Sequence, residues 1–153
     1  MRVKVEEQPT GDFSLGVGYS SIEKGKVTLG LNEKNFLGSG RSVKFAASVS
    51  DTAADYRLGL TEPYFLNRNL SGSFEVFNED VKADTVDIER TGFSTSVYFG
   101  AADDYYHRVG YDLAKNSTTQ KSSQATSLTG EENKSLTSSS VRYTLGRRTL
   151  DNR

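Results

Sequence analysis

Catalytic chemistry in this sequence would rest on very few side chains. His107 is the only histidine and there is no cysteine, so neither a Ser-His-Asp nor a Cys-His arrangement can be built around more than that single ring. His107 falls on the outward side of an alternating pattern, near a turn. At such a position a ring at a membrane interface is a better interpretation of this histidine than a catalytic group. We therefore expect no catalytic residues and no enzymatic activity.

Two further groups have the residue types of a ligand site but lack its context. GSGRS at Gly38–Ser42 has the glycine-rich composition of a phosphate-binding loop. No helix is expected after it whose N-terminus would hold the anion, so we expect a strand turn. Asp80, Asp84 and Asp87 lack the spacing and the glycine of a calcium-binding EF-hand loop, and a solvated polar loop is expected. The sequence thus predicts no metal and no cofactor.

The composition excludes several classes of protein. Lys and Arg total 19 against 20 for Asp and Glu, whereas a nucleic-acid binder normally carries a basic excess, so no nucleic-acid partner is expected. The mean hydropathy is −0.57, and no run approaches the roughly 18 apolar residues of a membrane helix. A transmembrane β-barrel stays compatible with these values, because its apolar residues alternate with polar ones.

Alternation with a period of two, the mark of a β-strand, recurs along the whole chain. In the first run, Phe13, Leu15, Val17 and Tyr19 alternate with Ser14, Gly16, Gly18 and Ser20. Comparable runs follow at Lys26–Asn32, Ser42–Ser50, Ala54–Glu62, Leu70–Phe77, Phe93–Phe99, Tyr105–Leu113 and Ser140–Gly146. No segment shows convincing helical periodicity, so we expect an all-β fold of about eight strands.

Two kinds of connection take turns between these runs. EKNFLGSGR, EPYFLNRN and GAADDYY are compact and rich in aromatic residues, whereas SSIEKG, SDTAAD, NEDVKADTVDIERT and the segment from Lys115 to Ser139 are polar. Because compact and polar connections alternate along the chain, they are expected at opposite ends of an antiparallel up-and-down meander, as in outer-membrane barrels. The segment 115–139 is low in complexity and is expected to be a loop.

The distribution of charge favours a membrane barrel over a soluble fold. A soluble sandwich or a soluble lipocalin-like binder remains an alternative. The apolar side of the runs carries almost no charge in mid-strand, where Arg or Lys facing lipid would cost ~2–4 kcal/mol. The opposite side holds charges that could pair across a lumen, namely Arg57, Glu75, Arg108, Asp112 and Arg142. Aromatic residues gather at the compact-turn end, where a membrane-interface girdle would lie: Phe36, Tyr64, Phe65, Tyr105 and Tyr106.

The turns also resemble those of a known family. KNFLGSGRS after the second run and LTEPYFL after the fourth are similar to the NFLG(T/S)G and NPYF-type turns of the BamA family, although Glu62 stands where Asn is more frequent. VKVEEQPTGDFSLGVGYSS resembles that family's junction between its last POTRA domain and its first barrel strand. GRRTLDNR resembles the D-x-R segment that precedes a PT-x-G turn. The resemblance covers nearly the whole chain, in order.

The resemblance implies a domain organisation in the bacterial outer membrane. Residues 1–11 would be the remainder of the junction to a preceding periplasmic domain, and residues 12–153 would form about eight transmembrane strands. These strands would be the first half of a sixteen-stranded barrel, without the POTRA domains, the (V/I)RGF motif of loop six or the closing last strand. Implied partners are the lipid bilayer or detergent, the other half of the barrel or a second copy, nascent outer-membrane proteins and, for full-length members, the Bam lipoproteins.

The resemblance also implies a mechanism of protein assembly and insertion by strand pairing. In this family the first strand closes the barrel poorly against the last and forms a lateral gate, so Phe13–Ser20 would pair with the C-terminal strand of an incoming protein. Gly16 and Gly18 would make that pairing easier to open, or would relieve crowding at a curved wall. A second hypothesis is a self-closing eight-stranded barrel with a structural or adhesive role, since eight strands can close a small barrel.

Overall fold

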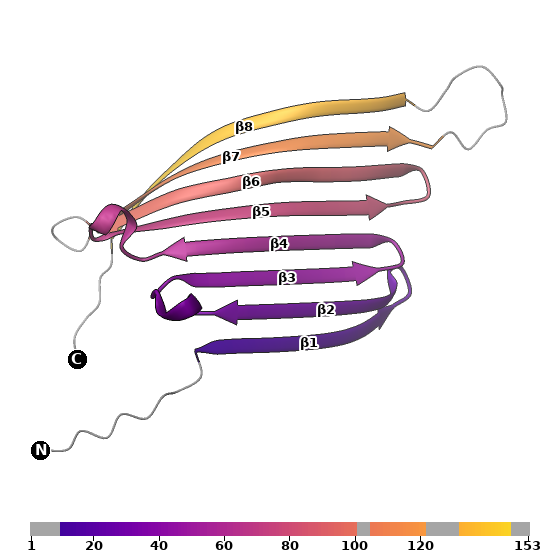
Figure 1. Ribbon diagram of the computed structural model, residues 1–153. Helices are drawn as coiled ribbons and strands as arrows, with labels where there is room; N and C mark the ends of the chain where they lie inside the picture. Colours follow the sequence, from indigo (N-terminus) through magenta and orange to yellow (C-terminus); the bar gives the residue numbers. More distant parts are fainter. Residues whose placement is uncertain (1–9, 101–104, 122–131, 148–153) are drawn as a thin grey trace, which may run out of the picture.

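The computed structural model describes residues 10–100, 105–121 and 132–147, which form a single antiparallel sheet (Figure 1). Its strands are β1 (Gly11–Ser20), β2 (Lys24–Glu33), β3 (Ser42–Ser50), β4 (Ala53–Glu62), β5 (Leu70–Lys82), β6 (Val86–Gly100), β7 (Tyr105–Gln120) and β8 (Glu132–Arg147). Two short 3-10 turns, η1 (Phe36–Gly38) and η2 (Phe65–Asn67), follow β2 and β4. Within these ranges, no helix has the length and apolar character needed to cross a membrane.

The order of strands in the sheet is the order of strands in the chain, from β1 to β8. Each strand therefore pairs only with its neighbours in sequence, which confirms the predicted all-β class and the antiparallel meander of eight strands. Among the described strands, β1 and β8 lie at opposite edges and do not pair (Figure 1). The sheet is thus unclosed, as expected for half of a larger barrel and unlike a closed eight-stranded barrel.

The register keeps apolar side chains of successive strands on one side of the sheet. Leu15 lies opposite Leu29, and Val76 lies opposite both Leu58 and Phe93. We call this side the apolar face, and the side that carries Gly16, Arg57 and Phe77 the polar face. A slip of one residue would exchange the two faces along a whole strand, so the alternation fixes the register.

The sheet has almost no protein core. Of the apolar residues in the described ranges, only Phe77 and Ala114 are buried, while Leu15 and Val17 on the apolar face are 64% and 82% exposed. Monomeric soluble proteins rarely expose a contiguous apolar surface of this extent. The arrangement therefore requires a second apolar phase against that face, as a lipid bilayer supplies.

The strands at the sheet's second half are longer than the sequence pattern predicts. The polar segments predicted as loops after Asn78 and Lys115 are largely strand, because β5 continues to Lys82 and β7 continues to Gln120. Likewise β8 begins at Glu132, so the prediction of a loop over 115–139 is wrong at both of its ends. The middle of that predicted loop, residues 122–131, lies outside the described residues.

Polar cross-strand pairs explain these extensions. The Asn78 side-chain amide donates to the Thr91 hydroxyl at 2.7 Å, and the Thr119 hydroxyl donates to Asn133 Oδ1. Such pairs stabilise neighbouring strands without any apolar side chain. Beyond the apolar band both faces of a strand meet water, so apolar alternation ends there while the backbone ladder continues.

η1 and η2 lie at the same end of the sheet (Figure 1). Each contains a leucine with left-handed backbone, Leu37 (φ 54°) and Leu66 (φ 58°). In the first of these turns, the Gly40 amide donates to Asn35 Oδ1 at 2.7 Å. The GSGRS segment is therefore part of a closed strand turn, as predicted, and has no helix behind it that could hold a phosphate.

Replacement of Asn35 tests this closure. Asn35→Ala should lower the free energy of unfolding by about 1 kcal/mol, because the Gly40 amide loses its acceptor. Urea unfolding of the protein in detergent micelles measures the change. Lys34→Ala serves as the matched control and should shift stability by less than about 0.5 kcal/mol. An equal loss in both variants would show that the Asn35 bond contributes nothing specific.

Candidate functional site

β1 is the free first edge of the sheet. It pairs with β2 in unbroken register from Gly11 opposite Glu33 to Ser20 opposite Lys24, and no described strand pairs with its other side. All of the predicted gate residues, Phe13 to Ser20, lie within this strand. An unpaired edge presents a row of backbone N–H and C=O groups, each costing several kcal/mol if left unsatisfied in lipid. β1 can therefore act as a template for another strand.

Side-chain hydrogen bonds contribute little to the pairing of β1 with β2. The Asn32 amide donates to Asp12 Oδ2 at 3.4 Å, and within the described ranges no other side-chain hydrogen bond joins these two strands. On the polar face the contacts are between small groups, since the Ser14 hydroxyl lies against Gly30. The backbone ladder and apolar cross-strand pairs such as Leu15 with Leu29 hold β1 to β2, so what distinguishes β1 from an interior strand of the described sheet is its unpaired second edge.

The two glycines of β1 have different surroundings. A Cβ at Gly16 would lie 2.5 Å from Thr28 Oγ1, whereas a Cβ at Gly18 would meet no atom within 4 Å. Relief of crowding, one of the two explanations predicted for these glycines, therefore applies to Gly16 and not to Gly18. At Gly18 the remaining effect of glycine is the weaker packing and greater backbone freedom that it gives the strand.

The middle of the polar face is bonded much more densely than this edge. Arg57 on β4 forms ion pairs with Asp55 at 3.0 Å, with Glu75 at 3.7 Å and with Glu79. Arg90 on β6 approaches Glu79 from the other side at 3.5 Å. This network connects three adjacent strands, so β4–β6 form a centre that charged side chains as well as the backbone ladder hold together.

A buried aromatic ring lies within this network. Phe77 is 8% exposed, and the guanidinium carbons of Arg57 and Arg90 lie 5.9 and 4.9 Å from its ring centroid. Cations at such distances are attracted to the face of an aromatic ring. The ring also lies over Gly92, where an added Cβ would come within 2.9 Å of it. Phe77 was not among the residues that the sequence pattern selected.

The charges predicted to pair across a lumen pair instead between neighbouring strands of one wall. Arg57 binds Glu75, and Arg142 on β8 lies 3.6 Å from Asp112 on β7. The guanidinium carbon of Arg108 lies 6.0 Å from the centroid of the Tyr98 ring. No group of three or more His, Asp or Glu side chains that could hold a metal ion occurs in the described ranges, and Asp80, Asp84 and Asp87 form none.

The predicted interface aromatics all lie at the end of the sheet that carries η1 and η2. Phe36 and Phe65 belong to these turns, Tyr64 precedes η2, and Tyr105 and Tyr106 begin β7. Tyr106 differs from the others because its ring lies on the polar face, over Gly146 on β8. The common end of the sheet agrees with a girdle, and the contact of these rings with the membrane interface stays a prediction.

An open antiparallel wall with one exposed apolar face, a bonded polar face and a free first edge defines a segment of a membrane β-barrel. The sequence model for the Omp85 superfamily domain matches residues 35–153, and the chain belongs to this superfamily. This membership, together with the relatives described below, confirms the predicted resemblance to the BamA family. Homologues in this family are outer-membrane assembly factors of Gram-negative bacteria, in agreement with the predicted location.

Two curated relatives match about half of the chain. A putative outer membrane protein assembly factor of Treponema pallidum (strain Nichols) is 36% identical over 78 residues, 48% of this chain and 9% of that protein. The outer membrane protein assembly factor BamA of Neisseria meningitidis serogroup B (strain ATCC BAA-335 / MC58) is 27% identical over 79 residues, 52% of this chain and 10% of that protein. The chain thus matches only about a tenth of the length of these relatives, whose names describe assembly factors and not enzymes.

A solved structure shows the same fold. BamA from Haemophilus ducreyi lacking POTRA domains 1-3 superimposes with a TM-score of 0.69 and 18% sequence identity, over 96% of this chain and 31% of that chain. The eight strands of the present sheet therefore correspond to a part of a larger barrel. This agreement extends along nearly the whole chain, although the sequences have diverged widely.

Proposed function

We propose that this segment takes part in the assembly and insertion of outer-membrane proteins, and that β1 pairs with a strand of the incoming protein. The observation that carries the proposal is the edge of β1, which pairs with β2 on one side and with no strand of the described ranges on the other. Membership in the Omp85 superfamily supports the same activity. The chain would act by hydrogen bonding between strands, without covalent chemistry.

The mechanism follows from the cost of unpaired backbone in lipid. A nascent outer-membrane strand that enters the bilayer alone leaves its N–H and C=O groups unsatisfied, and so does the edge of β1. Pairing the two edges satisfies both rows by β-augmentation, and the sheet grows by one strand. The bonded centre at Arg57 and Phe77 would keep the rest of the wall in place while the edge changes partner.

The proposed partners follow from this mechanism. The apolar face would contact the lipid bilayer, and β8 would pair with the remaining half of the barrel or with a second copy of the chain. Nascent outer-membrane proteins would bind at β1. Bam lipoproteins would be further partners of the full-length protein.

Site-directed disulfide trapping tests the role of β1, and within these 153 residues no native cysteine competes with an introduced one. In the full-length protein, Ser14→Cys on β1 should cross-link to a cysteine in the C-terminal strand of a nascent outer-membrane protein. Ser48→Cys is the matched control, since it makes the same exchange on the same face of the interior strand β3. We expect at least about tenfold more cross-linked product from Ser14→Cys. Equal yields from the two positions would overturn the assignment of β1 as the pairing strand.

A further inference from the structure

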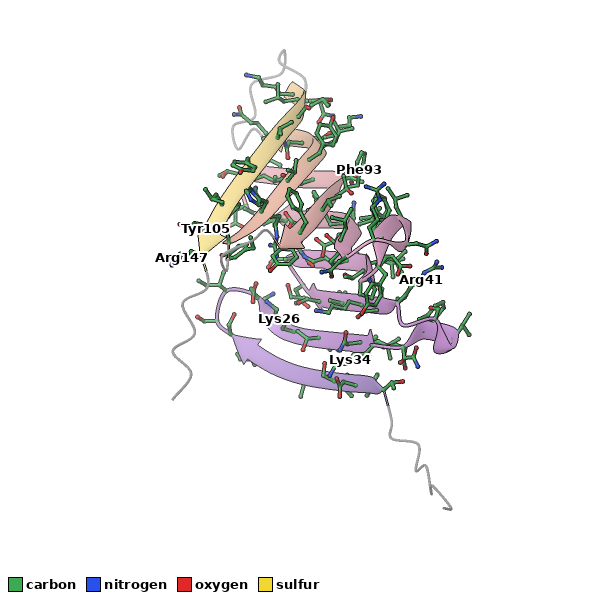
Figure 2. All side chains as sticks on the ribbon, turned by 90° about the vertical axis from the view of Figure 1, so that its left-hand side faces the viewer. Lys26, Lys34, Arg41, Phe93, Tyr105 and Arg147 are labelled. Carbon is green, nitrogen blue, oxygen red and sulfur yellow. The ribbon has the colours of Figure 1, made fainter. Side chains whose placement is uncertain are left out.

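A cluster of aromatic and basic side chains lies on the apolar face where β7 begins and β8 ends. We call it the β7–β8 cluster; its members are Tyr105, His107, Tyr143 and Arg147. Tyr105 lies opposite Arg147 and His107 lies opposite Leu145, so the register places these side chains on one face. Figure 2 shows Tyr105 and Arg147 beside one another at this end of the two strands. None of the four takes part in the proposed strand pairing at β1, which is at the other edge of the sheet.

The rings of this cluster form a connected row. The His107 ring stacks on Phe99 of β6, with centroids 4.9 Å apart and planes inclined by 14°. On its other side, His107 Nδ1 lies 2.7 Å from the Tyr143 hydroxyl. If Nδ1 accepts this bond, Nε2 carries a proton that can be donated elsewhere, and if Nδ1 donates it, the Tyr143 hydroxyl keeps its own proton. Either tautomer therefore leaves one hydrogen-bond donor for an external acceptor.

Arg147 supplies a positive charge next to this donor. Its guanidinium carbon lies 5.5 Å from the Tyr105 ring centroid, and the side chain has no carboxylate partner within the described ranges. At the same end of the sheet, Arg41 is neutralised by an ion pair with Glu62. Arg147 thus differs from Arg41, because its guanidinium lies against a ring and pairs with no carboxylate among the described residues, which leaves N–H donors for an anion.

We propose that the β7–β8 cluster binds the phosphate of an anionic phospholipid in the leaflet at the compact-turn end of the barrel. An arginine on the apolar face costs ~2–4 kcal/mol in mid-bilayer but little at the interface, so Arg147 marks the depth of the headgroups. Aromatic side chains concentrate at that depth, and a guanidinium binds phosphate through two parallel hydrogen bonds. This inference rests on the apolar face meeting lipid and is independent of the pairing proposed for β1.

The surroundings of the cluster favour a lipid over a free phosphate ion. Leu145 and Val109 continue the same face toward mid-sheet, and both are exposed. A ligand whose phosphate contacts Arg147 and whose acyl chains lie along these side chains satisfies the charged and the apolar part of the surface together. A free phosphate would satisfy only the first.

Fluorescence quenching by brominated lipids tests the site, because the chain has no tryptophan and a single reporter gives an unmixed signal. Leu145→Trp places the reporter beside the cluster, in the full chain reconstituted into phosphatidylcholine vesicles that contain brominated phosphatidylglycerol or brominated phosphatidylcholine. Leu31→Trp is the matched control, since Leu31 and Leu145 each lie two residues from the end of a strand, on the same face and at the same end of the sheet.

We expect brominated phosphatidylglycerol to bind about threefold more strongly than brominated phosphatidylcholine near Leu145→Trp, and equally near Leu31→Trp. Adding Arg147→Gln should abolish the preference, and Arg147→Lys should retain part of it. His107→Phe, which keeps a ring against Phe99 but removes both nitrogens, should reduce it.

Equal quenching by the two lipids at Leu145→Trp, or a preference that survives Arg147→Gln, overturns the proposal. Loss of the preference on adding inorganic phosphate would overturn the lipid assignment in favour of a free-phosphate site. None of these outcomes bears on cross-linking at Ser14→Cys.

Discussion

Gly92→Ala should lower the free energy of unfolding by about 3 kcal/mol, one of the two largest effects that we expect from a single substitution in this sheet. A Cβ at Gly92 would lie 2.2 Å from the Leu113 carbonyl oxygen and 2.8 Å from the Ala114 Cα. Both are backbone atoms of β7 and cannot rotate away, so relief requires β6 and β7 to separate. The same Cβ would also press on the Phe77 ring at 2.9 Å.

Gly110→Ala is the matched control for this prediction. Gly110 lies on β7, on the same polar face, but the nearest atom to its added Cβ is the Thr95 carbonyl oxygen at an ordinary 3.6 Å. Its loss of stability should stay below about 1 kcal/mol, the usual scale for a surface exchange. Urea titration in detergent micelles compares the unfolding midpoints of the two variants, with heat-modifiable gel mobility as the measure of the folded fraction. Similar midpoints would show that β6 and β7 can shift apart at Gly92 without cost.

The strands could be predicted from sequence because lipid on one face and a polar lumen on the other impose strict alternation. Each of the eight predicted runs lies within or overlaps a strand of the sheet. The prediction failed where that contrast ends, at Lys82 and at Gln120, because strands that extend beyond the membrane need no apolar side chain. There Ser, Thr and Asn pair across strands and resemble a loop in composition.

The candidate site was predicted unevenly for a related reason. The edge position of β1 follows from an up-and-down meander, because a first strand has only one neighbour in sequence. The bonded centre depends instead on register: Arg57 lies opposite Phe77, Phe77 opposite Gly92 and Gly92 opposite Ala114. Loop lengths and turn geometry set these pairings, and the alternation within single strands predicts neither of them. One signal was present, since Phe77 follows Phe74 by three residues and so must lie on the other face.

The interface residues divide in the same way. His107 was expected as an outward ring near a turn, and its position on the apolar face agrees with that expectation. Its hydrogen bond to Tyr143 joins residues that are not directly opposite in the register, because Tyr143 is opposite Val109. Tyr106 shows the complementary case, as it neighbours Tyr105 in sequence but must lie on the other face of the strand.

Phe77→Ala should also lower the free energy of unfolding by about 3 kcal/mol, and it tests whether the centre of the wall is the firm part of the structure. Phe77 is 8% exposed and has a guanidinium near its ring from each side, from Arg57 and Arg90. Truncation leaves a cavity over Gly92 and removes the ring that both cations contact.

Phe74→Ala is the control for this prediction, because Phe74 belongs to the same strand but lies on the apolar face and is 46% exposed. Lipid or detergent can fill the space that Phe74 vacates, so its loss should be near 1 kcal/mol. Urea midpoints in micelles distinguish the two, and equal losses would contradict a bonded centre at Phe77. If the edge and the centre are separable, Phe77→Ala should reduce stability while Ser14→Cys in the same protein still cross-links a nascent strand. Loss of cross-linking under conditions where the sheet remains folded would mean that the centre holds β1 in its pairing position.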